Sequence, residues 1–120
     1  MTTSITIHRE VPSQNKRERW HWAVQRKEVT TWAQFFAFHK SKLGLQNACG
    51  PRKLVITAYR KQRIQDYANL VGGCKGLLDG MVRAKLLVDD NMEMVTVEYK
   101  QELASKSPTK KPLTVIEIVE

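Results

Sequence analysis

Residues Gln65 to Asn91 read QDYANLVGGCKGLLDGMVRAKLLVDDN and hold the pattern around which the rest of the chain is organised. Between Leu70 and Lys85, apolar side chains recur at the spacing of one helix face, at Leu70, Leu77, Leu78, Met81 and Val82. The sequence therefore predicts a helix from Leu70 to Lys85 whose apolar stripe packs on a sheet.

Polar side chains that suit phosphate chemistry surround this predicted helix. They are Asp66 and Asn69 before it, Lys75 and Asp79 on one of its faces at i, i+4 spacing, and Asp89 and Asp90 after it. Carboxylate oxygens from separate segments suit Mg²⁺ or Mn²⁺. One or two such ions can activate water and offset the charge of a scissile phosphate, with a lysine as an additional cation. Two plainer interpretations stay open, because Lys75 and Asp79 can form an ordinary helix salt bridge and Asp89-Asp90 can be turn residues.

The remaining segments predict an α+β domain. The second predicted helix runs from Thr31 to Leu43, with Thr31-x-x-Gln34 as a capping box, Gly44 as its stop and an apolar stripe of Trp32, Phe35, Phe36, His39 and Leu43. The predicted strands are Ser4 to Glu10, Leu54 to Tyr59, Glu93 to Lys100 and Leu113 to Val119, the last two forming a hairpin across the basic loop Ser105 to Pro112. This order favours a single domain over residues 1–120, a small mixed sheet of about four strands packed by two helices.

The charge balance indicates a polyanionic partner. The chain has 20 Lys and Arg against 12 Asp and Glu, a net charge of +8, and nucleic acid is the usual partner of such a protein. Two cysteines without a CxxC pattern argue against a disulfide scaffold and a zinc site. Without a signal-like start or an apolar run of roughly 20 residues, we expect a reduced, cytoplasmic protein that does not contact a membrane.

Two basic stretches are candidates for DNA contact. Residues Lys16 to Lys27 combine cations such as Arg17 and Arg19 with Trp20, His21 and Trp22. Phosphate contacts with ring stacking are one interpretation, and an irregular hairpin is the other. The area that a buried ring removes from water favours core or dimer contacts for the two tryptophans, while the role of the cations stays open. Likewise Arg60, Lys61 and Arg63 form either a phosphate clamp or a solvated strand end.

One arrangement of these residues resembles a known family. Asp66-x-x-Asn69-Leu70, Lys75, Leu78-Asp79 and Leu87-Val88-Asp89-Asp90, followed by two strand-like runs, are similar to the pattern of the RusA-like Holliday junction resolvases, small endonucleases often encoded by phages and prophages. In this comparison Gly72-Gly73-Cys74 is an insertion that resembles the longer loop of some phage members. The element Pro12-Ser13-x-Asn15 resembles the family's early loop, whose asparagine lies near the active site.

The resemblance implies a fold, an activity and roles for individual residues. It implies the RusA-like fold, a homodimer and Mg²⁺-dependent cutting of four-way DNA junctions, in a bacterial host or encoded by a phage. Asp66 and Asp90 would hold metal together with Asp89, and Lys75 would stabilise the phosphate charge. Asn69, Asp79 and Asn15 would support the site.

One position departs from the family pattern. The family usually has a second acid directly before the asparagine, in the form Asp-x-Asp-Asn, and this chain has Ala68 there. Either Asp66 with Asp89 or Asp90 supports a weakened site, or a neighbour compensates, or the protein binds junctions without cutting them. A small interaction module whose charge only confers solubility is the remaining alternative.

Overall fold

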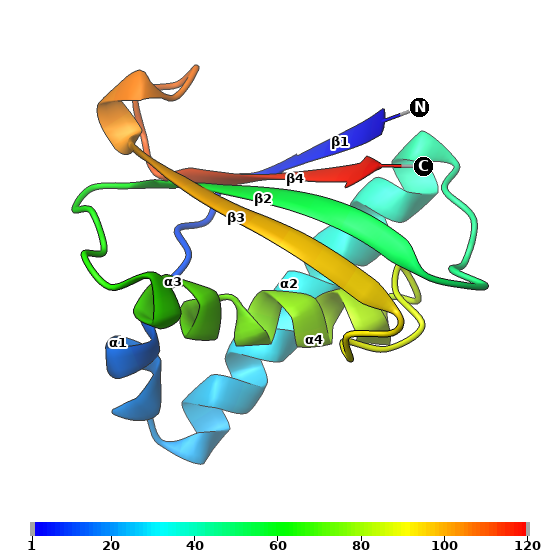
Figure 1. Ribbon diagram of the computed structural model, residues 1–120, viewed down its shortest axis with the longest axis horizontal. Coiled ribbons are helices and arrows are strands. Elements are labelled where there is room, and N and C mark those ends of the chain that lie inside the picture. Colours follow the sequence, from blue (N-terminus) through cyan, green and yellow to red (C-terminus); the bar gives the residue numbers. More distant parts are fainter. Residues whose placement is uncertain (1, 120) are drawn as a thin grey trace.

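The computed structural model describes residues 2–119, which form a four-stranded mixed sheet with helices on one face (Figure 1). The elements are β1 (Thr2–Ile7), α1 (Gln14–Glu18), α2 (Trp22–Leu43), β2 (Arg52–Arg60), α3 (Tyr67–Gly73), α4 (Lys75–Arg83), β3 (Val95–Leu103), the 3₁₀ helix η1 (Ala104–Lys106) and β4 (Leu113–Val119). The predicted α+β class and mixed sheet are confirmed, and the two longest helices, α2 and α4, cover the same side of the sheet. Within residues 2–119, no helix has both the length and the apolar character needed to cross a membrane.

The strand order is β1-β4-β2-β3, so the predicted hairpin of the last two strands is wrong. Strand β4 lies between β1 and β2 and is antiparallel to both, whereas β3 pairs with β2 in parallel. The burial pattern gives the reason. Strand β4 has only buried and half-buried residues, as a central strand requires, while β3 alternates with exposed charged residues that suit a sheet edge. Consequently β1, β2 and β3 all run in the same direction and end at the same edge of the sheet.

The core lies between the sheet and the helices. Ile5, Ile116 and Ile56 are opposite one another across β1, β4 and β2, and all three are almost completely buried. Trp32 of α2 and Met81 of α4 belong to the same core cluster. Each such side chain contributes about 1.5–3 kcal/mol through burial.

Helix α2 begins at Trp22, not at Thr31, so the predicted capping box is wrong. His21 caps the helix through Nδ1, which accepts from the Ala23 amide at 3.2 Å, and the Thr31 hydroxyl donates back to the Lys27 carbonyl at 2.9 Å. Residues 16–27 form α1 and the first turns of α2, so the interpretation of this stretch as an irregular hairpin is wrong.

Exposure explains why the sequence pattern missed these turns. Trp22 is 61% exposed, so the start of α2 carries no apolar stripe, and of the core or dimer contacts predicted for the tryptophans the structure excludes the core for Trp22. Of the predicted stripe, Trp32 and Phe36 are buried, whereas Phe35 and Leu43 are exposed. The predicted end of the helix is confirmed, because Gly44 caps it with φ 65°.

The helix predicted from Leu70 to Lys85 is divided into α3 and α4 at Cys74. Gly72 and Gly73 belong to α3, so the predicted loop insertion is also wrong. A Cβ atom on Gly73 would lie 1.9 Å from the Pro12 carbonyl oxygen, which shows how closely α3 approaches the segment after β1. The strand bounds differ less, with β1 beginning two residues earlier than predicted and β3 ending three residues later.

Gly80→Ala is expected to lower the free energy of unfolding by about 1–3 kcal/mol. A Cβ atom there would lie 2.7 Å from Trp32 Cβ and 2.9 Å from the Ala33 amide nitrogen, so α4 would be forced away from α2. This cost opposes the gain of about 1 kcal/mol from the helix propensity of alanine. Urea denaturation measures the effect. Gly50→Ala is the control, because nothing lies within 4 Å of its Cβ position. Unchanged or raised stability of Gly80→Ala would contradict the close packing.

Candidate functional site

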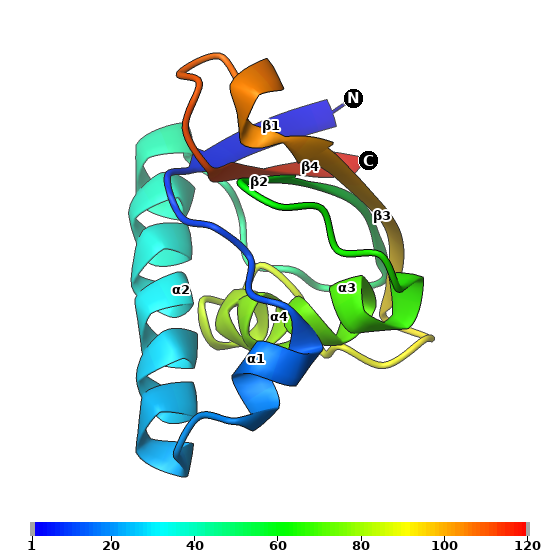
Figure 2. The ribbon, with the colours of Figure 1, turned by 90° about the vertical axis from the view of Figure 1, so that its left-hand side faces the viewer.

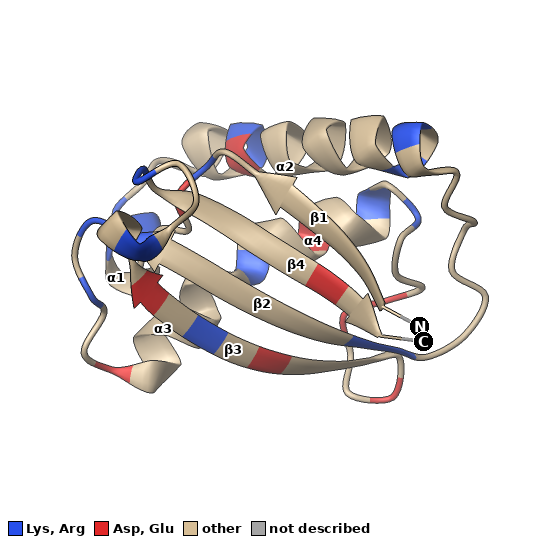
Figure 3. Ribbon diagram, turned by 90° about the horizontal axis from the view of Figure 1, so that it is seen from above, with Lys and Arg blue, Asp and Glu red and all other residues tan. Residues whose placement is uncertain are grey.

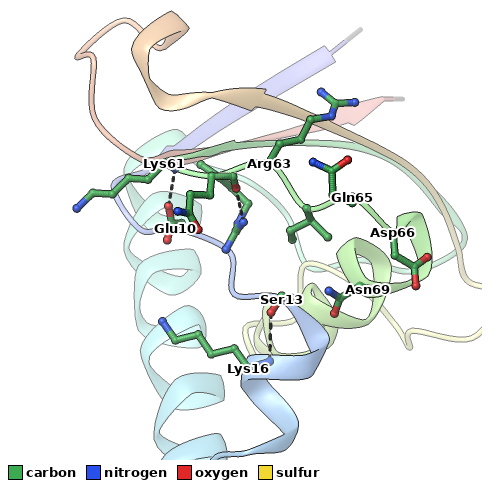
Figure 4. Close-up of a pocket in the computed structure, with 11 residues that line it drawn as sticks. Glu10, Ser13, Lys16, Lys61, Arg63, Gln65, Asp66 and Asn69 are labelled. Carbon is green, nitrogen blue, oxygen red and sulfur yellow. Dashed lines mark hydrogen bonds between the residues drawn. The ribbon is translucent and has the colours of Figure 1, made fainter.

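A cavity of about 640 Å³ lies where β2 ends, at the end of the sheet where the three parallel strands terminate (Figure 4). The segment after β2 forms one wall, and the segment that links β1 to α1 forms the other. Four of the lining side chains are cations and two are carboxylates, so the cavity favours an anion. The lining residues are Glu10, Ser13, Lys16, Arg60, Lys61, Gln62, Arg63, Ile64, Gln65, Asp66 and Asn69.

Hydrogen bonds hold the two walls together. Arg60 Nε donates to the Val11 carbonyl at 2.8 Å, and its Nη1 donates to the Gln62 carbonyl at 2.5 Å. The Lys61 amide donates to Glu10 Oε2 at 2.9 Å (Figure 4). Arg60 therefore ties the walls to each other, while the side chains of Lys61 and Arg63 are exposed to solvent.

The structure brings Asn15 and Asn69 together, although 54 positions separate them in the chain. The Asn15 amide donates to Asn69 Oδ1 at 2.9 Å, and Ser13 caps α1 by accepting from the Lys16 amide at 3.1 Å. The early Pro-Ser-x-Asn element thus lies beside α3. Asn15 contacts Asn69 through its backbone amide and not through its side chain. Lys16 lines the cavity because of the position of α1, and the sequence pattern offers no reason to single it out.

Asp66 caps α3, and its Oδ1 accepts from the Ala68 amide at 3.0 Å. Lys75 forms a separate charged group with Asp79 and Asp90: its Nζ lies 3.0 Å from Asp79 Oδ1 and 2.5 Å from Asp90 Oδ2. The hydrogen bond between Lys75 and Asp90 holds the pKa of the Asp90 carboxyl below its ordinary value. The same bond is the largest cause that raises the pKa of Lys75, and the hydrogen bond to Asp79 is the second. At neutral pH the structure thus favours a charged Asp90 and a charged Lys75.

The structure shows the plainer roles of Asp79 and Asp89, as a salt-bridge partner and as a turn residue. Asp79 forms the i, i+4 salt bridge with Lys75. Asp89 is a turn residue, since its Oδ1 accepts from the Asp90 amide at 2.7 Å and its Oδ2 from Asn91 Nδ2 at 3.2 Å. Neither contact prevents an additional role at a phosphate.

Tyr99 of β3 packs against the start of α3. Its ring contacts the ring of Tyr67, the first residue of α3, with centroids 6.3 Å apart. Burial raises the pKa of Tyr99 to about 12, and smaller contributions come from Cys74, Tyr67 and Asp90. Tyr99 therefore lies beside the first residue of α3, while Lys75, Asp79 and Asp90 do not line the cavity.

The carboxylates suit a sparsely coordinated Mg²⁺ ion. Among residues 2–119, no three Asp, Glu, His or Cys side chains form a cluster that could hold a metal. Mg²⁺ at phosphate sites commonly takes only one or two carboxylates and completes its shell with water and substrate oxygens. Asp66 and Asp90 are the carboxylates that could serve in that mode, and one oxygen of each already accepts a hydrogen bond, from the Ala68 amide and from Lys75 Nζ.

Arg17 and Arg19, both predicted to contact DNA, have different environments. Arg17 Nε lies 2.6 Å from Glu28 Oε1, and these side chains are only 14% and 1% exposed. Arg19 is exposed. Glu28 is a structural residue that the sequence pattern missed, because a single glutamate in a helix does not reveal that it faces the core.

Comparison with models of known protein families finds no match, and a search of curated proteins finds no match either. The similarity to RusA-like resolvases therefore stays a prediction.

Proposed function

We propose that this protein is a structure-specific endonuclease that binds branched DNA and hydrolyses a phosphodiester bond with Mg²⁺, or with Mn²⁺ in its place. The observation that carries the proposal is the cation-lined cavity beside Asp66 and Asn69. The net charge of +8 supports a polyanionic substrate. The order of Asp66, Lys75 and Asp90 along the chain, which resembles the RusA-like pattern, supports a metal-assisted reaction.

Each residue has a role in this proposal. Asp66 and Asp90 would hold the ion, with Asp89 as an additional oxygen ligand. Bound Mg²⁺ would supply Lewis-acid stabilisation of the phosphate and a lower pKa for water. Lys75, protonated beside Asp90, would offset negative charge on the phosphate.

The supporting residues act through position. Asn69 holds the start of α1 against α3 through the Asn15 amide, and Asp79 orients Lys75. Lys61 and Arg63 would contact the DNA backbone, and Arg60 keeps the cavity walls in place.

A homodimer suits the proposed substrate. A four-way junction is nearly two-fold symmetric, so two copies related by a two-fold axis could cut opposing strands and leave ligatable ends. The reaction would take place in the cytoplasm of a bacterial host, with the protein encoded by the host or by a phage.

Binding of junctions without cutting is the second candidate. Two observations favour it. Ala68 places a methyl group where the family pattern has a carboxylate, and Asp90 is already paired with Lys75. In this case the cation-lined cavity would serve affinity alone.

Cutting of a labelled four-way junction is expected with Mg²⁺ or Mn²⁺ and not with a chelator. Ala68→Asp is expected to cut faster, because it adds an oxygen ligand beside Asn69. Ala37→Asp, at an exposed position of α2, is the control for the added negative charge. Binding without cutting that Ala68→Asp converts into cutting would establish the second candidate. A protein that neither binds nor cuts would contradict both candidates and leave the interaction module.

A further inference from the structure

The connection between β3 and β4 is a second cationic feature, outside the cavity. It comprises residues 104–112, which we call the β3–β4 loop, and it contains Lys106, Lys110 and Lys111. Strand β2 lies between β3 and β4 in the sheet, so this loop has to cross over the end of β2. In the sheet Leu103 is opposite Arg60, and Leu113 is opposite Tyr59. The loop therefore spans the point from which Lys61 and Arg63 leave β2.

The β3–β4 loop and the cavity are parts of one end of the molecule. Figure 2 looks at this end, with the loop above the segment that follows β2 and with α1 below it. Figure 3 shows the basic positions of the loop and of the segment after β2 gathered at the same end of the sheet. Strands lie about 4.8 Å apart, so the four strands extend over about 14 Å, which corresponds to about four base pairs along a DNA strand.

The loop has a defined shape. Ser107 is only 1% exposed, and its hydroxyl donates to the Lys111 carbonyl at 2.8 Å and accepts from the Lys111 amide at 3.1 Å. The Lys110 amide donates to the Ser107 carbonyl at 3.1 Å, and Lys110 has φ 61°. These bonds hold the backbone of Lys110 and Lys111 in a tight turn, which lowers the conformational cost of using them for binding.

Charge and composition indicate what this turn would bind. Lys106 is paired with Glu102 at 3.6 Å, whereas Lys110 and Lys111 have no carboxylate partner among residues 2–119. Residues 104–112 contain no aromatic side chain on which an unpaired base could stack. Phosphates of double-stranded DNA fit these properties better than a single strand does.

We infer that the β3–β4 loop holds the backbone of a duplex arm of the branched substrate, with Lys110 and Lys111 as its phosphate contacts. This inference rests on the proposed function. It adds a second DNA contact that extends from the cavity across the end of the sheet.

Lys110→Gln with Lys111→Gln tests the inference by measuring affinity for a four-way junction and for linear duplex over a range of salt concentrations. Loss of two phosphate contacts is expected to weaken binding and to reduce the slope of log K against log salt by about 1.8. Lys53→Gln with Lys85→Gln is the matched control. It removes the same charge from two exposed positions outside the β3–β4 loop, Lys53 near the start of β2 and Lys85 just after α4. This control is expected to change the slope of log K against log salt much less.

The outcomes separate the inference from the proposed function. Equal losses of DNA affinity in the two double variants would mean general attraction by charge and would overturn the inference. A Lys110→Gln, Lys111→Gln variant that binds like the wild type would overturn it as well. Affinity for single-stranded DNA is measured in the same way, and a loss that is as large for single-stranded DNA as for duplex would overturn the assignment of a duplex arm. If the unmodified protein binds no DNA, the proposed function itself fails.

Ser107→Ala is a second test, which keeps both lysines. Without the hydroxyl bonds to Lys111, the turn is expected to loosen and duplex affinity to fall severalfold at low salt. Circular dichroism establishes whether the variant stays folded. Unchanged affinity in a folded variant would contradict the role of the fixed turn.

Discussion

Arg17→Met is expected to lower the free energy of unfolding by about 3 kcal/mol, because it leaves the buried carboxylate of Glu28 without its cation. Glu28 Oε2 already lacks a hydrogen-bond partner within the described residues, so Arg17 is the charge that compensates this group. The Gly76 Cα lies close by, since a Cβ there would be 2.3 Å from Glu28 Oε1, which leaves the carboxylate little room to move. Urea denaturation at neutral pH measures the change.

The double variant Arg17→Met with Glu28→Gln isolates the uncompensated charge. Because removing both charges avoids a buried lone carboxylate, the double variant is expected to recover most of the lost stability. Arg19→Met is the control at an exposed neighbouring position, with an expected change within about 0.5 kcal/mol. If Arg17→Met is no less stable than Arg19→Met, the pair does not hold α1 against α2.

Asp90→Asn is expected to reduce the rate of junction cutting by about 100-fold or more, which corresponds to about 2.7 kcal/mol of transition-state stabilisation. The amide is neutral, so it is a poorer ligand for a hard cation and a weaker partner for the Lys75 ammonium group. Single-turnover cleavage with Mg²⁺ measures the rate, in the unmodified chain or in Ala68→Asp, whichever cuts.

Two comparisons make this result specific. Glu117→Gln removes a carboxylate from β4 and is expected to cut at the wild-type rate. Junction affinity in the presence of chelator is expected to stay the same or rise slightly in Asp90→Asn, because the variant loses negative charge. Cutting within about threefold of the wild type would show that Asp90 does not hold the ion.

Local sequence patterns predicted the elements in which buried residues recur with a regular period. Strand β4 was predicted with its observed bounds, and β2 extends the predicted Leu54 to Tyr59 by a few residues. The i, i+4 spacing of Lys75 and Asp79 indicated a salt bridge as one of two interpretations, and Gly44 predicted the end of α2. In each case the signal lies within a few residues of the feature that it predicts.

Patterns failed where exposure or distant packing decides the structure. The start of α2 has exposed residues on all sides, so its periodicity is weak. Just before the division between α3 and α4, Gly73 lies in close contact with Pro12, which is more than 50 positions away in the chain.

Residue patterns alone were enough to predict the class of fold, the cationic character and the residue types that suit phosphate chemistry. Three features follow from the folded chain and not from local patterns: β4 lies between β1 and β2, Arg17 forms a buried ion pair with Glu28, and Asp66 lines a cavity with Lys16 while Asp90 is paired with Lys75. The physical reason is that strand neighbours, buried ion pairs and cavities depend on contacts between distant segments. Such contacts form only when the whole core is assembled.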